Sequence, residues 1–240
     1  MGGTRVVIRV VLTREATLND ALRVYLPEHV DVVEVPATMT HFRDVGAFDD
    51  ALRTELVDAT PKWLVLTSAR AAAYAARAVA LLGEDVRVAC VGSVTARAVR
   101  DAGVRVDLVG QSGARALGEL LEGVVLVVGA LEPLGELETS LSERAVANVS
   151  VPCYETVARE LSPSEQLAIA SAHVIFVGAP SAWRVVEPWL SERALVVVPG
   201  ETTAAQVGGR FDVMAGWNDQ LAGRLRAWIT AREKEFGQGQ

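Results

Sequence analysis

The chain has 240 residues, of which 50% are hydrophobic and 22% are charged. It therefore carries enough apolar side chains for a packed core and is not a disordered segment. Its length favours two domains of about 120 residues each. The net charge of -7 repels polyanions, which excludes duplex nucleic acid as an expected partner. An anionic small molecule would have to be bound by local arginines or by backbone dipoles.

Short runs rich in Val and Ile recur along the chain, and each segment between them is long enough for one helix. This alternation predicts β-α-β units and parallel sheets covered on both faces. The predicted strands are 6–12, 30–36, 63–67, 86–91, 106–109, 124–128, 149–157, 174–177, 194–198 and 211–214. The predicted helices include 69–82, 94–102, 114–121 and 217–233.

The first apolar run, 6–12, is interrupted by Arg9 and is shorter than the roughly 20 residues of a membrane span. It also lacks a small-residue cleavage site, so we expect a cytoplasmic protein without membrane contact.

Cys90 and Cys153 lie in apolar runs outside any C-x-x-C pair, which predicts buried structural thiols. The three histidines are scattered, and we expect no metal site and no cofactor.

An internal repeat is the most informative global feature. The stretch 64–96 is echoed by 174–204, so that Gly92 matches Gly200 and Thr95 matches Thr203. In this pairing Gly178 stands where the first copy has Ser68. The chain is therefore expected to contain two similar lobes.

Four turns of the repeat, 67–70, 92–95, 178–181 and 200–203, join a predicted strand to a predicted helix. Unpaired N–H groups at such turns bind carboxylates or phosphates at the carboxyl edge of an α/β sheet. The Ser and Thr residues there are equally typical of helix N-caps, which serve stability alone. Four equivalent turns favour a binding cleft. The chain has no GxxxxGK[ST], GxGxxG or GxSxG motif, which argues against ATP, dinucleotide and esterase chemistry.

Several stretches at these turns resemble the uroporphyrinogen-III synthase family over nearly the whole chain. They begin at Val11 (Val-Leu-Thr-Arg), Trp63 (Trp-Leu-Val-Leu-Thr-Ser-Ala-Arg-Ala), Val91 (Val-Gly-Ser-Val-Thr-Ala-Arg), Val151 (Val-Pro-Cys-Tyr-Glu-Thr), Phe176 (Phe-Val-Gly-Ala-Pro-Ser-Ala) and Pro199 (Pro-Gly-Glu-Thr-Thr-Ala). The resemblance implies two parallel-sheet, flavodoxin-like α/β lobes joined by a two-stranded linker. Lobe 1 would be discontinuous, with residues 1–38 and 157–240. Lobe 2 would span 43–152, and the linker strands 39–42 and 153–156.

The resemblance also implies the reaction: the linear tetrapyrrole hydroxymethylbilane is cyclised to uroporphyrinogen III, with loss of water and inversion of the terminal ring. Such an enzyme is a cofactor-independent lyase of haem, sirohaem and cobalamin synthesis. Because the uncatalysed reaction gives the uninverted isomer, catalysis consists largely of positioning a flexible chain. We expect a monomer whose partner is this octacarboxylate.

Family positions carried over to this sequence give Tyr154 as the candidate acid that assists loss of the hydroxyl group. A strand tyrosine packed for stability alone is the other interpretation of Tyr154. The candidate substrate-binding residues are Arg14, Ser68, Arg70, Ser93, Thr95, Arg97, Ser181, Thr202 and Thr203, with Arg184 as a further arginine beside a turn. Where the family often has an arginine near the end of one strand, this chain has Val128 and Gly129.

Two other functions stay open at the level of sequence. One is a non-catalytic sensor of the same architecture that binds an anionic metabolite, although the chain has no room for an appended signalling segment. The other is a glycosyl- or phosphoryl-transfer enzyme with two α/β lobes, which the missing phosphate loop and the scarcity of His and paired acids disfavour.

Overall fold

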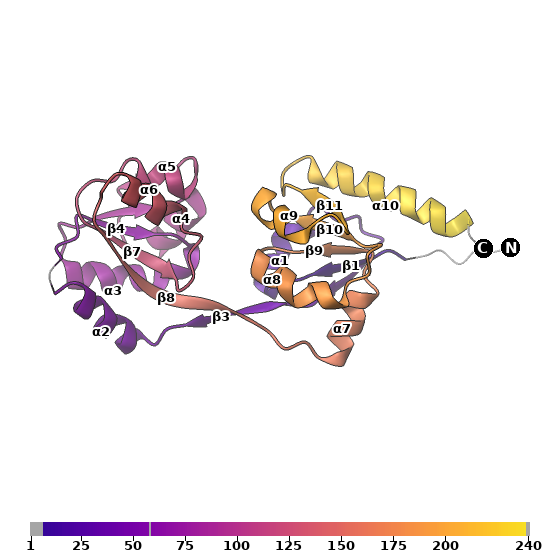
Figure 1. The fold of residues 1–240 in the computed structure, drawn as a ribbon, viewed down its shortest axis with the longest axis horizontal. Helices are drawn as coiled ribbons and strands as arrows, with labels where there is room; N and C mark the ends of the chain where they lie inside the picture. The colour runs from indigo at the N-terminus through magenta and orange to yellow at the C-terminus, as the bar shows by residue number, and fades with distance from the viewer. Residues whose placement is uncertain (1–6, 58, 239–240) are drawn as a thin grey trace. The chain divides into compact units, whose positions relative to one another are not determined.

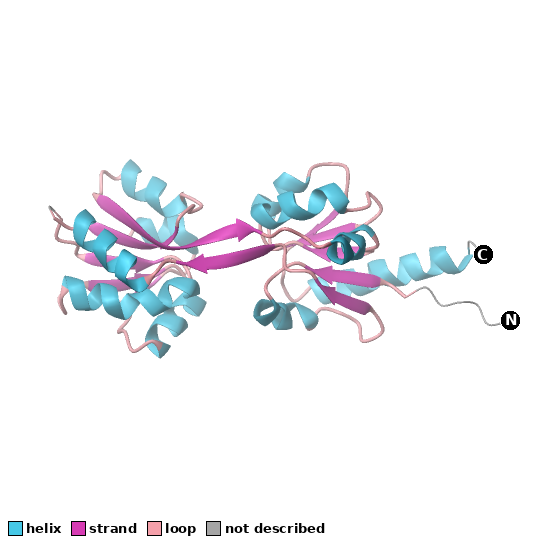
Figure 2. Cartoon of the chain, turned by 90° about the horizontal axis from the view of Figure 1, so that it is seen from below, coloured by secondary structure: helices cyan, strands magenta, loops and turns pink. Residues whose placement is uncertain are grey.

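The computed structural model describes residues 7–57 and 59–238 and contains two compact units (Figure 1). Unit 1 comprises Met1–Met39 and Val157–Gln240, and unit 2 comprises Thr40–Thr156. Each unit has its own sheet, and Figure 2 shows helices on both sides of each sheet. The expected α/β class with parallel sheets is confirmed. Among the described residues, no helix combines the length and apolarity needed to cross a membrane.

The sheet of unit 1 has five parallel strands in the order β11-β10-β9-β1-β2. These strands are β1 (Arg9–Leu12), β2 (Asp31–Glu34), β9 (Val174–Phe176), β10 (Leu195–Val198) and β11 (Asp212–Ala215). Numbered by their appearance in the chain, they give the spatial order 2-1-3-4-5 of flavodoxin-like sheets. The direction of strand addition reverses between β1 and β9, and ligands of such sheets bind outside the carboxyl ends at this switch point.

Helices cover both faces of this sheet because successive strand residues point to opposite sides and are apolar on both. Val11 belongs to one core cluster with Ile175 and Val196, whereas Val10 and Leu12 belong to the other. The helices of unit 1 are α1 (Ala16–Arg23), α7 (Pro163–Ala170), α8 (Pro180–Val186), η2 (Glu187–Trp189), α9 (Glu201–Val207) and α10 (Leu221–Gln238).

The sheet of unit 2 has the order β3-β8-β7-β4-β5-β6, and its last five strands are parallel. Its strands are β3 (Thr38–Phe42), β4 (Trp63–Leu66), β5 (Arg87–Cys90), β6 (Leu108–Val109), β7 (Val125–Ala130) and β8 (Asn148–Ala158). Here β7 and β8 occupy the places that β1 and β2 have in unit 1, and β4, β5 and β6 occupy those of β9, β10 and β11. The two parallel sheets are thus related by a circular permutation.

The helices of unit 2 again form two layers around the sheet. They are α2 (Val45–Glu55), η1 (Ala69–Ala71), α3 (Ala72–Leu82), α4 (Ser93–Asp101), α5 (Gly113–Gly118) and α6 (Glu136–Glu143). Leu64, Leu66 and Cys90 pack into one core cluster, and Trp63 and Val65 pack into the other. This two-sided burial explains why the strands read as unbroken apolar runs.

All ten predicted strands are observed, with ends that differ by a few residues; Val6 lies outside the described residues. Two helix starts differ from expectation in helix type or by more than one residue. The predicted helix 69–82 begins as the 3₁₀ turn η1, and the helix expected from Trp217 begins only at Leu221. The later start has a local cause: the Oδ1 of Asn218 accepts a hydrogen bond from the backbone N–H of Gln220 at 3.1 Å, and this turn competes with the helix.

His173 makes the stability of unit 1 sensitive to acid. Its Nδ1 accepts a hydrogen bond from the backbone N–H of Arg9 at 3.0 Å, and burial, with the nearby Arg9 charge, lowers its pKa below the usual value of 6.5. Between the usual pKa and the lowered one, the unfolded chain binds a proton that the folded chain does not. The contribution of His173 to stability is therefore complete above about pH 6.5 and is lost as the pH falls through the folded-state pKa.

We accordingly expect His173→Gln, whose amide oxygen can accept the same bond without titrating, to reduce the loss of stability between pH 7 and pH 5. Urea unfolding at both pH values measures this difference, with His29→Gln at an exposed histidine as the control. An unchanged pH dependence in His173→Gln would contradict the assignment.

Candidate functional site

The carboxyl ends of the parallel strands meet the helix starts at one edge of each sheet, and the candidate residues of each unit gather there. The residue before the helix is Ser68 after β4, Gly92 after β5, Ala179 after β9 and Gly200 after β10. Each of the four has extended backbone angles, so the first helical N–H groups point out of the sheet edge. These edges are the expected ligand sites of open α/β sheets.

Helix capping accounts for only one of the four turns. The Oγ of Ser68 accepts a hydrogen bond from the backbone N–H of Arg70 at 3.3 Å, as a capping residue does. At the other three turns the N-cap residue is Gly or Ala and provides no side-chain cap. The hydroxyl groups of those turns lie instead inside the first helical turn, at Ser93 and Thr95 in α4, Ser181 in α8 and Thr202 and Thr203 in α9.

These hydroxyl residues differ in their access to a ligand. Ser93 and Thr202 are exposed, and Ser181 is half-buried. Thr95 and Thr203 occupy equivalent third positions of their helices and are both buried. The structure therefore leaves Ser93, Thr202 and Ser181 reachable from solvent and places Thr95 and Thr203 in the packing beneath the edge.

The expected match of Gly178 with Ser68 is wrong by one residue. Ser68 is the N-cap of η1 and Ala179 is the N-cap of α8, so these two positions are equivalent. Gly178 therefore corresponds to Thr67. Residue identity alone pairs Gly178 with Ser68, whereas the positions of the N-caps show that the second copy is offset by one residue. The second copy lacks the hydroxyl of Ser68 because it has Ala179 there.

Tyr154 owes its orientation to a β-bulge in β8. Gly129 of β7 pairs with Pro152, but the next residue, Ala130, pairs with Tyr154, so Cys153 is the extra residue. In a regular strand Tyr154 would point away from the face of Cys153; the bulge brings both into the same core cluster. Tyr154 is 8% exposed, and among the described residues its hydroxyl group has no hydrogen-bond partner.

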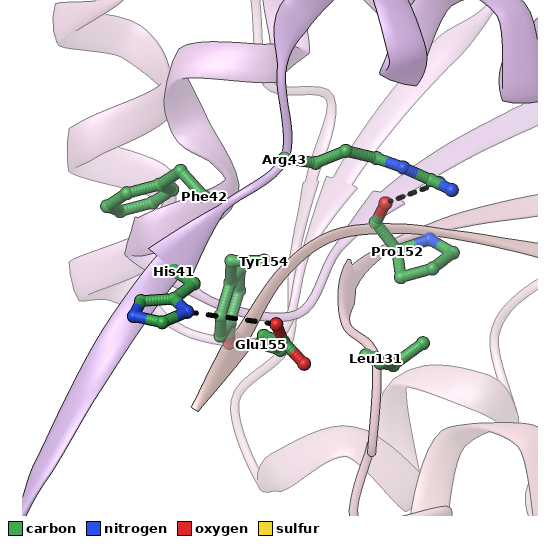
Figure 3. Close-up of a pocket in the computed structure, with 7 residues that line it drawn as sticks. All are labelled: His41, Phe42, Arg43, Leu131, Pro152, Tyr154 and Glu155. Atoms are coloured by element: carbon green, nitrogen blue, oxygen red, sulfur yellow. Dashed lines mark hydrogen bonds and ion pairs between the residues drawn. The ribbon is translucent and has the colours of Figure 1, made fainter. Parts of the chain in front are cut away.

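A pocket of about 200 Å³ opens beside Tyr154 (Figure 3). Its other lining residues are His41, Phe42, Arg43, Leu131, Pro152 and Glu155. Pockets for drug-sized ligands measure roughly 300–1,000 Å³, so this one has room for one ring or side chain of a larger molecule. Figure 3 shows His41 and Glu155 facing one another beside the tyrosine, with the Nδ1 of His41 3.8 Å from the carboxylate of Glu155.

The sequence had not singled out these six neighbours of Tyr154 as site residues. Phe42 lies near the tyrosine, with ring centroids 6.3 Å apart. The backbone N–H of Arg43 donates to the carbonyl of Cys153 at 2.9 Å, and its guanidinium donates to the carbonyl of Pro152 at 3.2 Å. The signal that could have found them is Pro152, because a proline inside a strand marks an edge or a bulge.

Arg14 and Arg70 are each stacked on an aromatic ring at a sheet edge. The guanidinium carbon of Arg70 lies 5.8 Å from the centre of the Tyr154 ring, and that of Arg14 lies 5.3 Å from the Trp217 ring. Such a cation–π contact restricts a long side chain and holds its positive charge at the sheet edge. Ser68, Arg70 and Tyr154 therefore form one group in unit 2.

Arg97 and Arg184 are not part of these stacked groups. Arg97 is exposed on α4, one helical turn after Ser93 and on the same face. Arg184 is exposed on α8. In the described parts of the chain, no hydrogen bond or ion pair joins either arginine to another candidate residue.

The two cysteines are buried and free. Burial raises the pKa of Cys90 to about 11 and that of Cys153 to about 12, so almost no thiolate is present at neutral pH. We expect iodoacetamide at about pH 7.5 to leave both thiols unmodified in the folded protein and to alkylate both in concentrated guanidinium chloride. Mass spectrometry counts the added groups, and rapid labelling of the folded chain would contradict the burial of these residues.

Comparisons with known proteins place these features in a family. A family model described as uroporphyrinogen-III synthase HemD matches residues 28–210. The crystal structure of a mutant uroporphyrinogen III synthase from the extremely thermophilic bacterium Thermus thermophilus aligns with a TM-score of 0.59 and 17% identity, covering 95% of this chain and 99% of that one. The crystal structure of uroporphyrinogen-III synthetase from Helicobacter pylori gives 0.61 and 16%, covering 92% and 99%. No curated protein sequence matches the chain.

Proposed function

Because the chain belongs to the uroporphyrinogen-III synthase family, we propose that it converts hydroxymethylbilane to uroporphyrinogen III and water without a cofactor. Family membership makes it an enzyme of tetrapyrrole synthesis. In the proposed reaction the hydroxyl group leaves as water and an electrophilic methylene carbon remains, which the substituted α-carbon of the terminal ring at the other end attacks to form a spiro intermediate. The bond between this α-carbon and its original methylene bridge then breaks, and the free α-carbon of the same ring bonds to that bridge, so that the ring is inverted. A final deprotonation restores the aromatic pyrrole. Classification as a cyclising lyase follows from these steps.

The reaction requires mainly that the protein hold the substrate in one conformation. The substrate cyclises without enzyme, although to the uninverted isomer, so the enzyme has to favour one attacking carbon over another. Fixing a flexible chain in one near-attack geometry can provide several kcal/mol of selectivity without a nucleophile. The sheet edges suit this task because they present N–H groups, hydroxyl groups and arginines on rigid strand ends.

The observation that carries the proposal is the group formed by Tyr154, Arg70 and the pocket beside them. The phenol is the proposed acid that protonates the leaving hydroxyl group. The resulting phenolate takes up the proton released when the last pyrrole regains aromaticity, so the acid is regenerated in each cycle. Arg70, stacked on the Tyr154 ring, is suited to bind a substrate carboxylate close to this acid.

The remaining candidate residues are proposed to bind the eight carboxylates. In unit 2 these are Ser68, Ser93 and Arg97, and in unit 1 they are Arg14, Ser181 and Thr202. Thr95 and Thr203 are buried and are better suited to support the helix starts. We further propose a cytoplasmic monomer that does not bind nucleic acid, since its net charge is -7 and a polyanion would be repelled.

The decisive experiment is an isomer assay. Freshly prepared hydroxymethylbilane is incubated with the purified protein, the products are oxidised, and the type I and type III porphyrins are separated by chromatography. We expect type III to predominate, whereas buffer and heat-denatured protein give type I. A product mixture no richer in type III than these controls would overturn the proposal. Binding of the octacarboxylate product without such enrichment would identify a non-catalytic binding protein instead.

A further inference from the structure

At the switch point of each unit, a glycine faces a larger residue across two neighbouring strands. The glycine lies on opposite members of the equivalent strand pair in the two units. In unit 1 the residues that follow the pair Leu12–Phe176 bring Arg14 opposite Gly178. In unit 2 the residues that follow the pair Leu66–Val128 are Thr67 and Gly129. Gly178 and Thr67 are equivalent, since each precedes the N-cap of the next helix, and therefore Arg14 and Gly129 are equivalent as well.

Each switch point has room for one of the two side chains. A Cβ added to Gly129 would lie 2.2 Å from the Oγ1 of Thr67, and a Cβ added to Gly178 would lie 3.2 Å from the Cγ of Arg14. The first distance is far inside van der Waals contact, and the second is tight. In unit 2 a hydroxyl group occupies this space, whereas in unit 1 the stem of an arginine does.

Several contacts of unit 1 fix the position of Arg14. On its N-terminal side, the Oγ1 of Thr13 donates to the carbonyl of Phe176 at 2.7 Å. On its C-terminal side, the buried Asn19 donates from Nδ2 to the carbonyl of Arg14 itself at 3.1 Å. The guanidinium stacks on Trp217, whose ring in turn packs against Phe176 at a centroid distance of 6.3 Å.

We propose that the switch point of unit 1 is a carboxylate subsite, in which Arg14 binds one carboxylate of the substrate and Trp217 positions its guanidinium. Gly178 provides the space in which the arginine stem lies. The planar guanidinium has five N–H donors, enough for a bidentate contact with a carboxylate in addition to its contacts within the protein. The equivalent place in unit 2 is neutral because it holds Thr67. This inference rests on the proposed function and names one group that would bind a carboxylate of the substrate.

The test compares Arg14→Met, which keeps the aliphatic stem and removes the charge, with Arg14→Lys and wild type. The readouts are kcat and KM for hydroxymethylbilane and, by calorimetry, the Kd for uroporphyrinogen III kept reduced. A charge-assisted hydrogen bond is worth enough to predict a rise in KM and Kd of about tenfold to 100-fold in Arg14→Met. We expect a smaller rise in Arg14→Lys and little change in kcat, because the lost contact binds the substrate and the transition state alike.

A second set of variants examines Trp217 and Gly178. Trp217→Leu should raise KM and Kd about threefold to tenfold through loss of the ring beneath the guanidinium, whereas Trp217→Phe should restore most of the affinity. Gly178→Thr alone should lower Tm. Adding Arg14→Gly to it, which recreates the pair found in unit 2, should restore Tm while Kd stays as weak as in Arg14→Met.

Unchanged KM and Kd in Arg14→Met, with an active wild-type protein, would overturn the subsite and leave the proposed function intact. The same would follow if Trp217→Phe and Trp217→Leu were equally impaired. A wild-type protein without type III enrichment that still binds uroporphyrinogen III through Arg14 would retain the subsite and overturn the function. Absence of both enrichment and binding would overturn both.

Discussion

Replacing Tyr154 by Phe is expected to lower kcat about 100-fold and to leave KM within about twofold of the wild-type value. The variant keeps the ring that fills the cluster with Cys153 and that stacks under Arg70, and loses only the hydroxyl group. Loss of a general acid typically costs a factor of about 10² to 10⁴. Steady-state kinetics with hydroxymethylbilane, corrected for the uncatalysed reaction, measures the change.

The matched control is Tyr74→Phe in the same unit. The hydroxyl group of Tyr74 donates to the carbonyl of Arg43, so this variant should lose about 1 kcal/mol of stability and keep its kcat. Tyr154→Phe should show the opposite pattern, with normal urea unfolding and impaired turnover. Normal turnover in a folded Tyr154→Phe would remove the tyrosine from the role of acid.

Gly129→Ala is expected to destabilise unit 2 by about 1–3 kcal/mol, because the new methyl group would lie 2.2 Å from the Oγ1 of Thr67. Rotation of Thr67 away from it is restricted by the branching at Cβ. Both residues lie at the carboxyl end of the central strands, so the strain falls at the sheet edge that carries the candidate site. Urea unfolding monitored by tryptophan fluorescence gives the free energy of unfolding.

Thr67→Ala is expected to rescue Gly129→Ala, because it removes the atom that collides. Gly92→Ala serves as the control, since a Cβ there would meet no atom within 4 Å and the backbone is extended. A double variant as unstable as Gly129→Ala alone would show that Thr67 is not the cause of the strain.

The apolar runs were sufficient to predict every described strand except β3, because sheets that are covered on both faces require unbroken apolar segments. A strand at 39–42 was expected only from the family resemblance. Runs such as 63–67 and 194–198 have no competing helical interpretation, since each is short and ends at a turn signal. The motif order was sufficient to predict the family. The boundary near Trp217 was less predictable, because a single Asn218 side chain decides where the helix starts.

The orientation of Tyr154 could not be read from the sequence. Strict alternation in β8 would place Tyr154 on the face opposite Cys153, and only the pairing of Ala130 with Tyr154 reveals the extra residue. The sequence also did not reveal that Arg14 is equivalent to Gly129 and that Gly178 is equivalent to Thr67. This equivalence depends on which residues face one another across two strands, and the sequence order of the two copies differs by a circular permutation.

That permutation has a consequence for the order in which the chain folds during its synthesis. The five parallel strands of unit 2 come from one uninterrupted stretch, so that unit can close its sheet as soon as Thr156 has left the ribosome. The central pair of unit 1 joins Val10 to Val174, so almost three quarters of the chain must be made before β1 can pair with β9. Within the early segment 7–39, β1 can pair with β2 at once, but the other edge of β1 stays unpaired until β9 is made. This edge is where a nascent chain would most need a chaperone.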